Sequence, residues 1–213
     1  DLKENHSLPK APLTTVVTKH WKAVLKVILV SFGQNAGYWV GFIFMNIYMT
    51  EYLELPRTFV YWLMAGISFT MAFLMPLSGA MSDRFGRKKV LIGACVAFIV
   101  LTVPAFMALN TAQFWPVLIV ELAMCATLTA NDGTLSSYLT ETFPTSVRFT
   151  GFAFSFNLAN AIFGGTAPFI ATWLIYTTGS SIAPAWYMVA VAAVALVAMI
   201  LSHENTDKDL SRI

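Results

Sequence analysis

Two long uncharged runs flank a short, highly charged segment, and this pattern constrains the fold more than any other feature of the chain. Residues 58–82 and 90–120 contain no Asp, Glu, Lys or Arg, whereas Asp83, Arg84, Arg87, Lys88 and Lys89 crowd the interval between them. A water-soluble domain cannot bury runs of this length, but a bilayer accepts them, because about 20 apolar residues cross its hydrocarbon core. The sequence therefore predicts membrane helices joined by a very short, charged loop.

The composition agrees with a membrane protein. Hydrophobic residues make up 57% of the chain and charged residues 11%, the reverse of a soluble domain. Cys95 and Cys125 lie in apolar stretches without metal or redox spacing, so we expect them to be packing residues. All three histidines fall in the terminal segments, which excludes a histidine proton relay within the spans. We expect no metal and no cofactor.

The hydropathy pattern predicts an all-α, polytopic membrane protein with six transmembrane helices. The apolar runs are too long for strands and lack the alternation of a membrane barrel. We expect a bundle over 23–202, preceded by a cytoplasmic segment or linker over 1–22 and followed by a cytoplasmic tail over 203–213. The six predicted spans are 24–48, 59–81, 90–109, 114–139, 151–176 and 184–202.

The distribution of Lys and Arg predicts the orientation of the bundle. If the N-terminus is cytoplasmic, twelve of the thirteen Lys and Arg residues lie on the inner side and only Arg57 lies outside. Such an excess of inner positive charge is typical of a fixed topology, so we expect both termini in the cytoplasm.

The charged loop predicts a latch between conformations. Gly79 and Gly86 permit close approach and a tight reversal, and Asp83 can cap a neighbouring helix N-terminus while Arg87 and Lys88 bridge to acidic groups. The alternative is that these residues only enforce topology as a basic inner loop.

The pattern Gly79-x-x-x-Asp83-Arg84-x-Gly86-Arg87-Lys88 resembles the signature loop between the second and third helices of each half of the major facilitator superfamily. Residues 138–151 are similar to the matching loop between helices ten and eleven. With Gly164-Gly165, Pro168 and the segment 178–184, the chain is similar to the metabolite:proton symporters, which include proline/betaine, citrate, 2-oxoglutarate and shikimate carriers.

This resemblance covers nearly the whole chain and implies the C-terminal half of a twelve-helix carrier. It implies that Asp83, Arg84 and Arg87 form part of a cytoplasmic gate against the other half. Gly79, Gly86 and Lys88 are the other residues of the same signature and belong to the same gate. Glu141 and Arg148 match a second network that ties helix ends to the first loop. The implied location is the plasma membrane, as in a bacterial inner membrane.

Two acids lie inside the predicted fourth span. Glu121 and Asp132 are eleven residues apart, about three helical turns, so they share one face with Cys125 and Leu128 between them. A charged acid at mid-bilayer costs about 2.5–3.5 kcal/mol, so such residues face a cavity or a partner. A carboxyl removed from water favours its neutral form, and either acid is thus a candidate for proton coupling. The alternative is a structural pair or hydrogen bond with another half.

Polar residues in three spans are candidates for the wall of a substrate cavity. Amides in lipid require partners, which either a hydrated substrate path or a neighbouring helix supplies, and both readings stay open. The candidates are Gln34, Asn35 and Tyr38 in the first span, Asn131 in the fourth, and Asn157 and Asn160 in the fifth. The run Gly33-x-x-x-Gly37-x-x-x-Gly41 predicts close helix packing, and Gly164-Gly165 with Pro168 predicts a bent point in the fifth span.

These features predict a secondary active transporter that works by alternating access. The intramembrane acids and the resemblance to the metabolite:proton symporters favour proton symport, and the resemblance implies that the cargo is a small organic acid or a zwitterionic osmolyte such as proline or betaine; uniport and antiport are alternatives. A channel, a non-transporting sensor, an ATP-driven pump and an enzyme are disfavoured, since no phosphate-binding loop or catalytic motif occurs.

The expected partners are a small-molecule substrate, protons, the lipid bilayer and a second six-helix half, from the same full-length chain or another protomer. No nucleic acid is expected to bind. The chain starts at Asp1, and we expect it to be a fragment rather than a natural half.

Overall fold

The computed structural model describes residues 11–202, and every regular element among them is helical. The predicted tail over 203–213 and the first ten residues of the predicted segment over 1–22 lie outside this range. The elements, in which η marks a π-helical segment, are α1 Pro12–Lys19, α2 Trp21–Tyr38, η1 Trp39–Phe44, α3 Met45–Ile47, η2 Tyr48–Tyr52, α4 Arg57–Phe85, α5 Arg87–Leu109, α6 Phe114–Thr140, α7 Arg148–Ala159, η3 Asn160–Gly164, α8 Gly165–Thr178 and α9 Ala183–Leu201.

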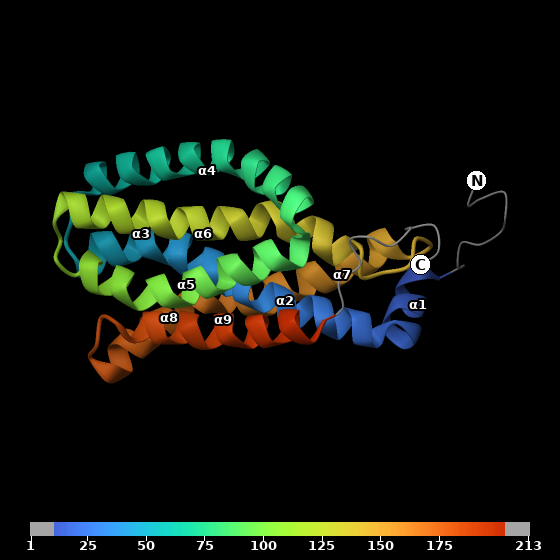
Figure 1. Ribbon diagram of the computed structural model, residues 1–213. Helices are drawn as coiled ribbons and strands as arrows, with labels where there is room; N and C mark the ends of the chain where they lie inside the picture. Colours follow the sequence, from blue (N-terminus) through green and yellow to red (C-terminus); the bar gives the residue numbers. More distant parts are fainter. Residues whose placement is uncertain (1–10, 203–213) are drawn as a thin grey trace.

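Six continuous helices are long and apolar enough to cross a membrane, which confirms the predicted fold class. They are Trp21–Tyr52, Arg57–Phe85, Arg87–Leu109, Phe114–Thr140, Arg148–Thr178 and Ala183–Leu201. Several start or end a few residues beyond the predicted spans, because hydropathy detects the apolar part of a helix and not the polar turns that continue it. The α6–α7 loop, the α4–α5 junction and the start of α2 lie toward the same end of the bundle (Figure 1).

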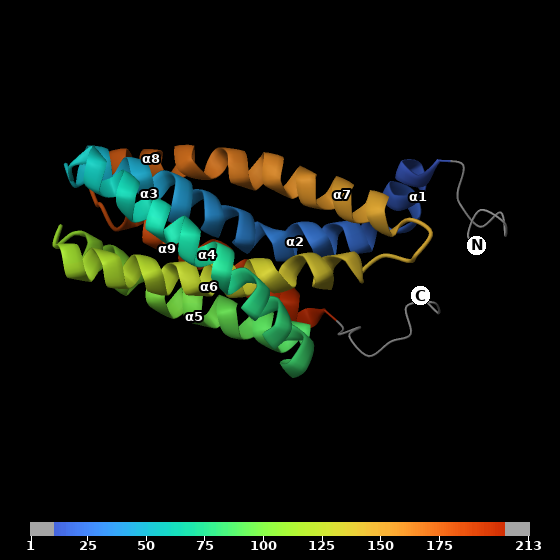
Figure 2. The same cartoon turned by 90° about the horizontal axis from the view of Figure 1, so that it is seen from above.

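The helices pack as a bundle with two peripheral members. Helix α6 packs against α4 and α5, α9 packs against α2 and α5, and α7 packs along α2. The spans containing α4 and α7–α8 are the least buried of the six. In Figure 2, α7 and α8 run along one edge of the bundle and α5 along the other, with α2 between them. Helices α2 and α6 therefore form the interior that α4 and α7–α8 flank.

The charged segment is much more helical than the predicted loop. Residues up to Phe85 belong to α4 and residues from Arg87 belong to α5, so Gly86 alone joins the two helices. Its φ of 92° lies in a region that side chains with a Cβ rarely adopt, which explains why glycine stands at this position.

Two helix crossings depend on glycine. A Cβ on Gly33 of α2 would stand 2.6 Å from Cβ of Ala195 on α9, as expected for the glycine run of the first span. A Cβ on Gly133 of α6 would stand 2.8 Å from the carbonyl oxygen of Met75 on α4, and Ser78 also lies against this position. The second crossing was not predicted from the sequence.

Three π-helical segments interrupt the first and fifth spans. Segments η1 and η3 meet where the indole Nε1 of Trp39 donates to Oδ1 of Asn160 at 2.9 Å. Gly164, the last residue of η3, leaves the space that this pair occupies. The bend predicted near Gly164 and Pro168 is thus a π-helical turn, a distortion that frequently marks functional sites.

Candidate functional site

The central feature of the bundle is a hydrogen bond between two spans. Asp132 lies in the last third of α6, and its Oδ1 accepts from Nε2 of Gln34 on α2. Gln34 is 5% exposed and Asp132 is half-buried. Among residues 11–202 the ion pairs involve Arg57 and Arg87, so no cation of this part of the chain pairs with Asp132. A carboxylate held by an amide alone retains lone pairs that can bind a proton or a further donor.

The second intramembrane acid, Glu121, is more deeply buried. Its exposed fraction is 2%, and it lies on the same buried face of α6 as Cys125 and Leu128. No ion pair formed within the described chain reaches Glu121.

The amides predicted as cavity candidates divide into two groups. Asn160 bonds to Trp39 across two spans, and Nδ2 of Asn157 donates at 2.8 Å to the carbonyl oxygen of Ala153 on its own helix. Asn35 and Asn131 are buried, and each has a side-chain atom without a hydrogen-bond partner. Of these amides, Gln34 and Asn160 therefore join two spans, whereas Asn157 is exposed and bonds within its own helix.

Tyr38 borders an aromatic patch on the first span. Its ring stacks on Phe42 with centroids 5.6 Å apart and meets Trp39 edge-on at 6.4 Å. Phe42 in turn lines a groove between the first span and α4, to which Asn46 and Ser68 contribute polar groups. Sequence analysis did not select Phe42 or Ser68, because isolated aromatic and hydroxyl residues carry no periodic signal.

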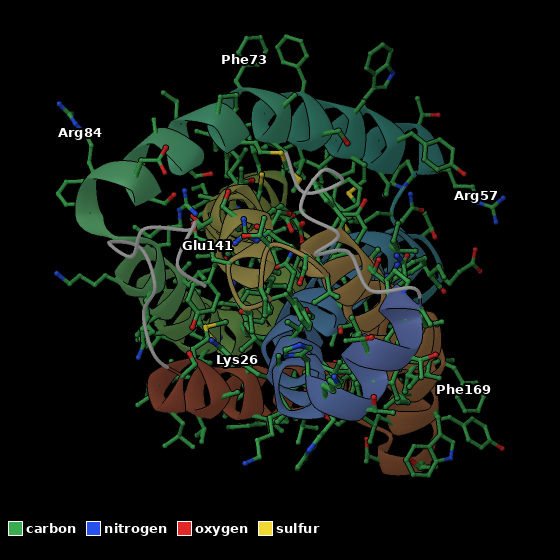
Figure 3. All side chains as sticks on the ribbon, turned by 90° about the vertical axis from the view of Figure 1, so that its right-hand side faces the viewer. Lys26, Arg57, Phe73, Arg84, Glu141 and Phe169 are labelled. Carbon is green, nitrogen blue, oxygen red and sulfur yellow. The ribbon has the colours of Figure 1, made fainter. Side chains whose placement is uncertain are left out.

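The charged residues of the predicted gate form a network at one end of the bundle. The guanidinium of Arg87, at the start of α5, forms an ion pair with Glu141 at the end of α6 and a second, 3.4 Å pair with Asp83 on α4. Arg84 points away from the bundle, whereas Glu141 lies over its middle (Figure 3). Arg148 instead holds the α6–α7 loop, since its Nε donates to the carbonyl oxygen of Phe143 at 3.3 Å.

Hydrogen bonds at the same end of the bundle also hold the C-terminal end of α9. Nζ of Lys88 donates to the carbonyl oxygen of Ile200 at 3.0 Å and to that of Ser202, and the hydroxyls of Tyr138 and Ser202 are hydrogen-bonded to each other. Lys26 lies over the ring of Tyr138, with Nζ 5.1 Å from the centroid. Lys88 was predicted for the gate, but its contact with the end of α9 was not, because nothing in sequence spacing pairs residues so far apart.

The comparisons with known proteins agree with this architecture. The sequence model of the Major Facilitator Superfamily matches residues 27–212. The chain is 36% identical over 199 residues to the Ectoine/proline transporter ProP of Corynebacterium glutamicum, covering 93% of this chain and 39% of that protein. It is 28% identical over 202 residues to the Proline/betaine transporter of Salmonella typhimurium, covering 95% and 40% respectively.

A further relative is the Inner membrane metabolite transport protein YhjE of Escherichia coli K12, 31% identical over 213 residues, with 94% of this chain and 47% of that protein covered. The chain thus spans less than half the length of each of these curated relatives.

Proposed function

We propose, from the premise that this chain belongs to the Major Facilitator Superfamily, that it forms one six-helix half of a secondary active transporter. The substrate site lies between this bundle and a second six-helix half, and the two halves rock to expose it to either side of the membrane. Both chain ends are cytoplasmic, as the excess of Lys and Arg on that side favours. The membrane is the bacterial inner membrane.

The observation that carries a proton-coupled mechanism is the Asp132–Gln34 hydrogen bond. It holds a carboxyl group inside a membrane span, and the described part of the chain offers that carboxyl an amide partner and no cation. Proton binding to Asp132 removes a charge that lipid and apolar side chains do not tolerate, and proton release restores it. Glu121 is the second candidate, although its deeper burial favours a permanently neutral carboxyl.

The cargo is a zwitterionic osmolyte of the proline and betaine class. The names of two relatives support this class, and so does the chemistry of the groove that Phe42 and Asn46 line. Aromatic faces such as those of Tyr38 and Phe42 attract an alkylated ammonium group, and amides accept or donate hydrogen bonds. The carboxylate of the cargo finds its cation on the other half, because no Lys or Arg lies deep in the described spans.

The charge network around Arg87 closes the cytoplasmic end of the path. Its ion pairs join α4, α5 and the end of α6 within this half, so these helix ends move as one unit when the two halves separate. Asp83, Arg84 and Lys88 contribute exposed or half-buried groups that the second half can contact. Gly86 keeps the α4–α5 junction compact, and Gly79 lies against Gly133 at the crossing of α4 and α6.

The test uses the full-length carrier that contains this chain, reconstituted in liposomes loaded with a pH-sensitive dye. Proline, betaine, ectoine, citrate, 2-oxoglutarate and shikimate are added singly to wild type and to the variants Asp132→Asn, Glu121→Gln and Glu51→Gln. We expect acidification of the lumen with a zwitterion, at least a tenfold loss in Asp132→Asn, and no loss in the control Glu51→Gln, whose carboxylate is exposed and paired with Arg57. Substrate uptake without any pH change in wild type would establish uniport instead.

A further inference from the structure

A small pocket lies inside the bundle, behind the Asp132–Gln34 hydrogen bond. It is enclosed by α2, α5, α6 and α9 and has room for about one water molecule. The polar side chains that line it are those of Gln34, Cys95, Thr127 and Asn131. A proline or betaine molecule is far too large for this space, so the pocket is separate from the proposed substrate path.

Two oxygen atoms in this pocket lack a donor. Oε1 of Gln34 and Oδ1 of Asn131 are buried without a hydrogen-bond partner, and both residues are more than nine-tenths buried. The orientation of the Gln34 amide is fixed, because its nitrogen donates to the Asp132 carboxylate and its oxygen would be repelled there. The Gln34 oxygen therefore needs a hydrogen-bond donor on the side of the amide that faces away from Asp132.

The other polar groups of the lining do not supply that donor, and Oε1 of Gln34 accepts nothing from the neighbouring Asn131 amide either. The hydroxyl of Thr127 donates at 2.8 Å to the carbonyl oxygen of Met124 within its own helix. The thiol of Cys95 donates at 3.3 Å to the carbonyl oxygen of Ala192. Among the side chains that line the described pocket, the two amide oxygens are thus the buried acceptors that still lack a hydrogen-bond donor.

We infer that this pocket binds one ordered water molecule, which donates one hydrogen bond to Gln34 and one to Asn131. A water has two donor hydrogens and matches a pair of acceptors, and buried polar groups of this kind are usually satisfied by water. A cation such as Ca²⁺ requires about six to eight oxygen ligands, and no carboxylate lines the pocket. The ligand class is therefore a small neutral hydrogen-bond donor.

The water links α6 to α2 through a second path, since Asn131 and Asp132 are adjacent on α6 and Gln34 contacts both the water and Asp132. It holds the Gln34 amide with its nitrogen toward the carboxylate. Its importance for proton coupling rests on the proposed function, whereas the presence of the water does not. Gln34 and Asn131 are accordingly positioning residues and not substrate contacts.

The test is a structure of the full-length carrier at a resolution that shows ordered waters, for wild type and two variants. We expect a density peak about 2.7–3.2 Å from both amide oxygens in wild type. Asn131→Leu removes one acceptor and fills the space, so the peak should disappear. Thr127→Val is the matched control on the same lining, and because the Thr127 hydroxyl is already bonded within its helix, the peak should remain.

A dry pocket in wild type, at a resolution where other buried waters are visible, would overturn the inference. So would a peak that persists in Asn131→Leu, or a peak whose occupancy follows the sodium concentration, which would identify a cation. Proton uptake by the same preparations is measured separately. A clear peak in a carrier that moves no protons would leave the water site standing and refute the proposed coupling.

Discussion

At the residue scale, Arg87 binds two carboxylates that differ in exposure. The Glu141 side chain is 11% exposed and the Asp83 side chain 67%. Loss of a buried partner costs about 3–5 kcal/mol, but water still reaches this pair, so we expect Glu141→Gln to lower the free energy of unfolding by about 2 kcal/mol. Asp83→Asn removes an exposed partner and should cost about 0–1 kcal/mol.

The two variants are compared by thermal unfolding of the detergent-solubilised carrier, with Arg87→Gln as the common reference. In the Arg87→Gln background, the further change Glu141→Gln should have a much smaller effect, because the partner is already gone. Equal shifts for Asp83→Asn and Glu141→Gln would show that burial does not distinguish these two pairs.

Gly164 offers a second residue-scale prediction. A Cβ at this position would collide with the indole of Trp39 and the amide of Asn160, while a Cβ on the adjacent Gly165 meets nothing within 4 Å. Gly164→Ala should therefore destabilise the protein by about 1–3 kcal/mol, the usual cost of overpacking. Gly165→Ala should be neutral or slightly stabilising, because alanine favours helix more than glycine does. Thermal unfolding of both variants checks this, and similar melting temperatures would argue against a tight η1–η3 contact.

At the element scale, the approach of α4 to α6 depends on one glycine. The hydroxyl of Ser78 donates to the carbonyl oxygen of Thr129 at 3.0 Å, and Gly133 lies against the α4 backbone at the same crossing. Gly133→Ala should push α4 away from α6 and break this hydrogen bond, since the carbonyl of Met75 cannot move independently of its helix. Disulfide cross-linking of a cysteine pair placed across this crossing should slow at least tenfold in Gly133→Ala.

The matched control is Gly66→Ala, which lies on α4 and has open space around its added Cβ. Its cross-linking rate should equal that of wild type. An unchanged rate in Gly133→Ala would mean that the helices accommodate a methyl group at the crossing.

At the scale of the whole molecule, alternating access predicts which positions water and substrate reach. In a carrier whose Cys95 and Cys125 are replaced by alanine, cysteine at Asn46 should react with a water-soluble thiol reagent, because Asn46 lines the groove beside α4. The transported substrate should slow that reaction severalfold. Cysteine at Val100 is the control: this α5 residue is 64% exposed but apolar, so we expect it to face lipid and to react little.

Labelling at Val100 equal to that at Asn46 would contradict the proposed division between a lipid-facing and a cavity-facing side. Labelling at Asn46 that the substrate does not alter would place the binding site elsewhere in the carrier.

The six spans and the asymmetry of their flanking charges were predictable from the amino-acid sequence. A bilayer imposes its requirement on each helix separately, so length and hydropathy of a single run are sufficient information. The sequence also identified Asp132, Glu121 and the charged residues around Gly86, because a charge inside or beside an apolar run is conspicuous. The contacts of those residues could not be predicted from hydrophobic periodicity. Periodicity indicates which face of a helix is buried, but it does not indicate which other helix packs against that face.

The side-chain partners of these residues became known from the packing of the helices. Gln34 meets Asp132 across 98 residues of sequence and Trp39 meets Asn160 across 121, and both contacts depend on how the first span lies against α6 and η3. The same packing leaves the oxygens of Gln34 and Asn131 without donors and places Gly133 against Ser78. Such features arise from the distances between helices, which are set by the summed packing of many side chains and are not encoded in any single segment.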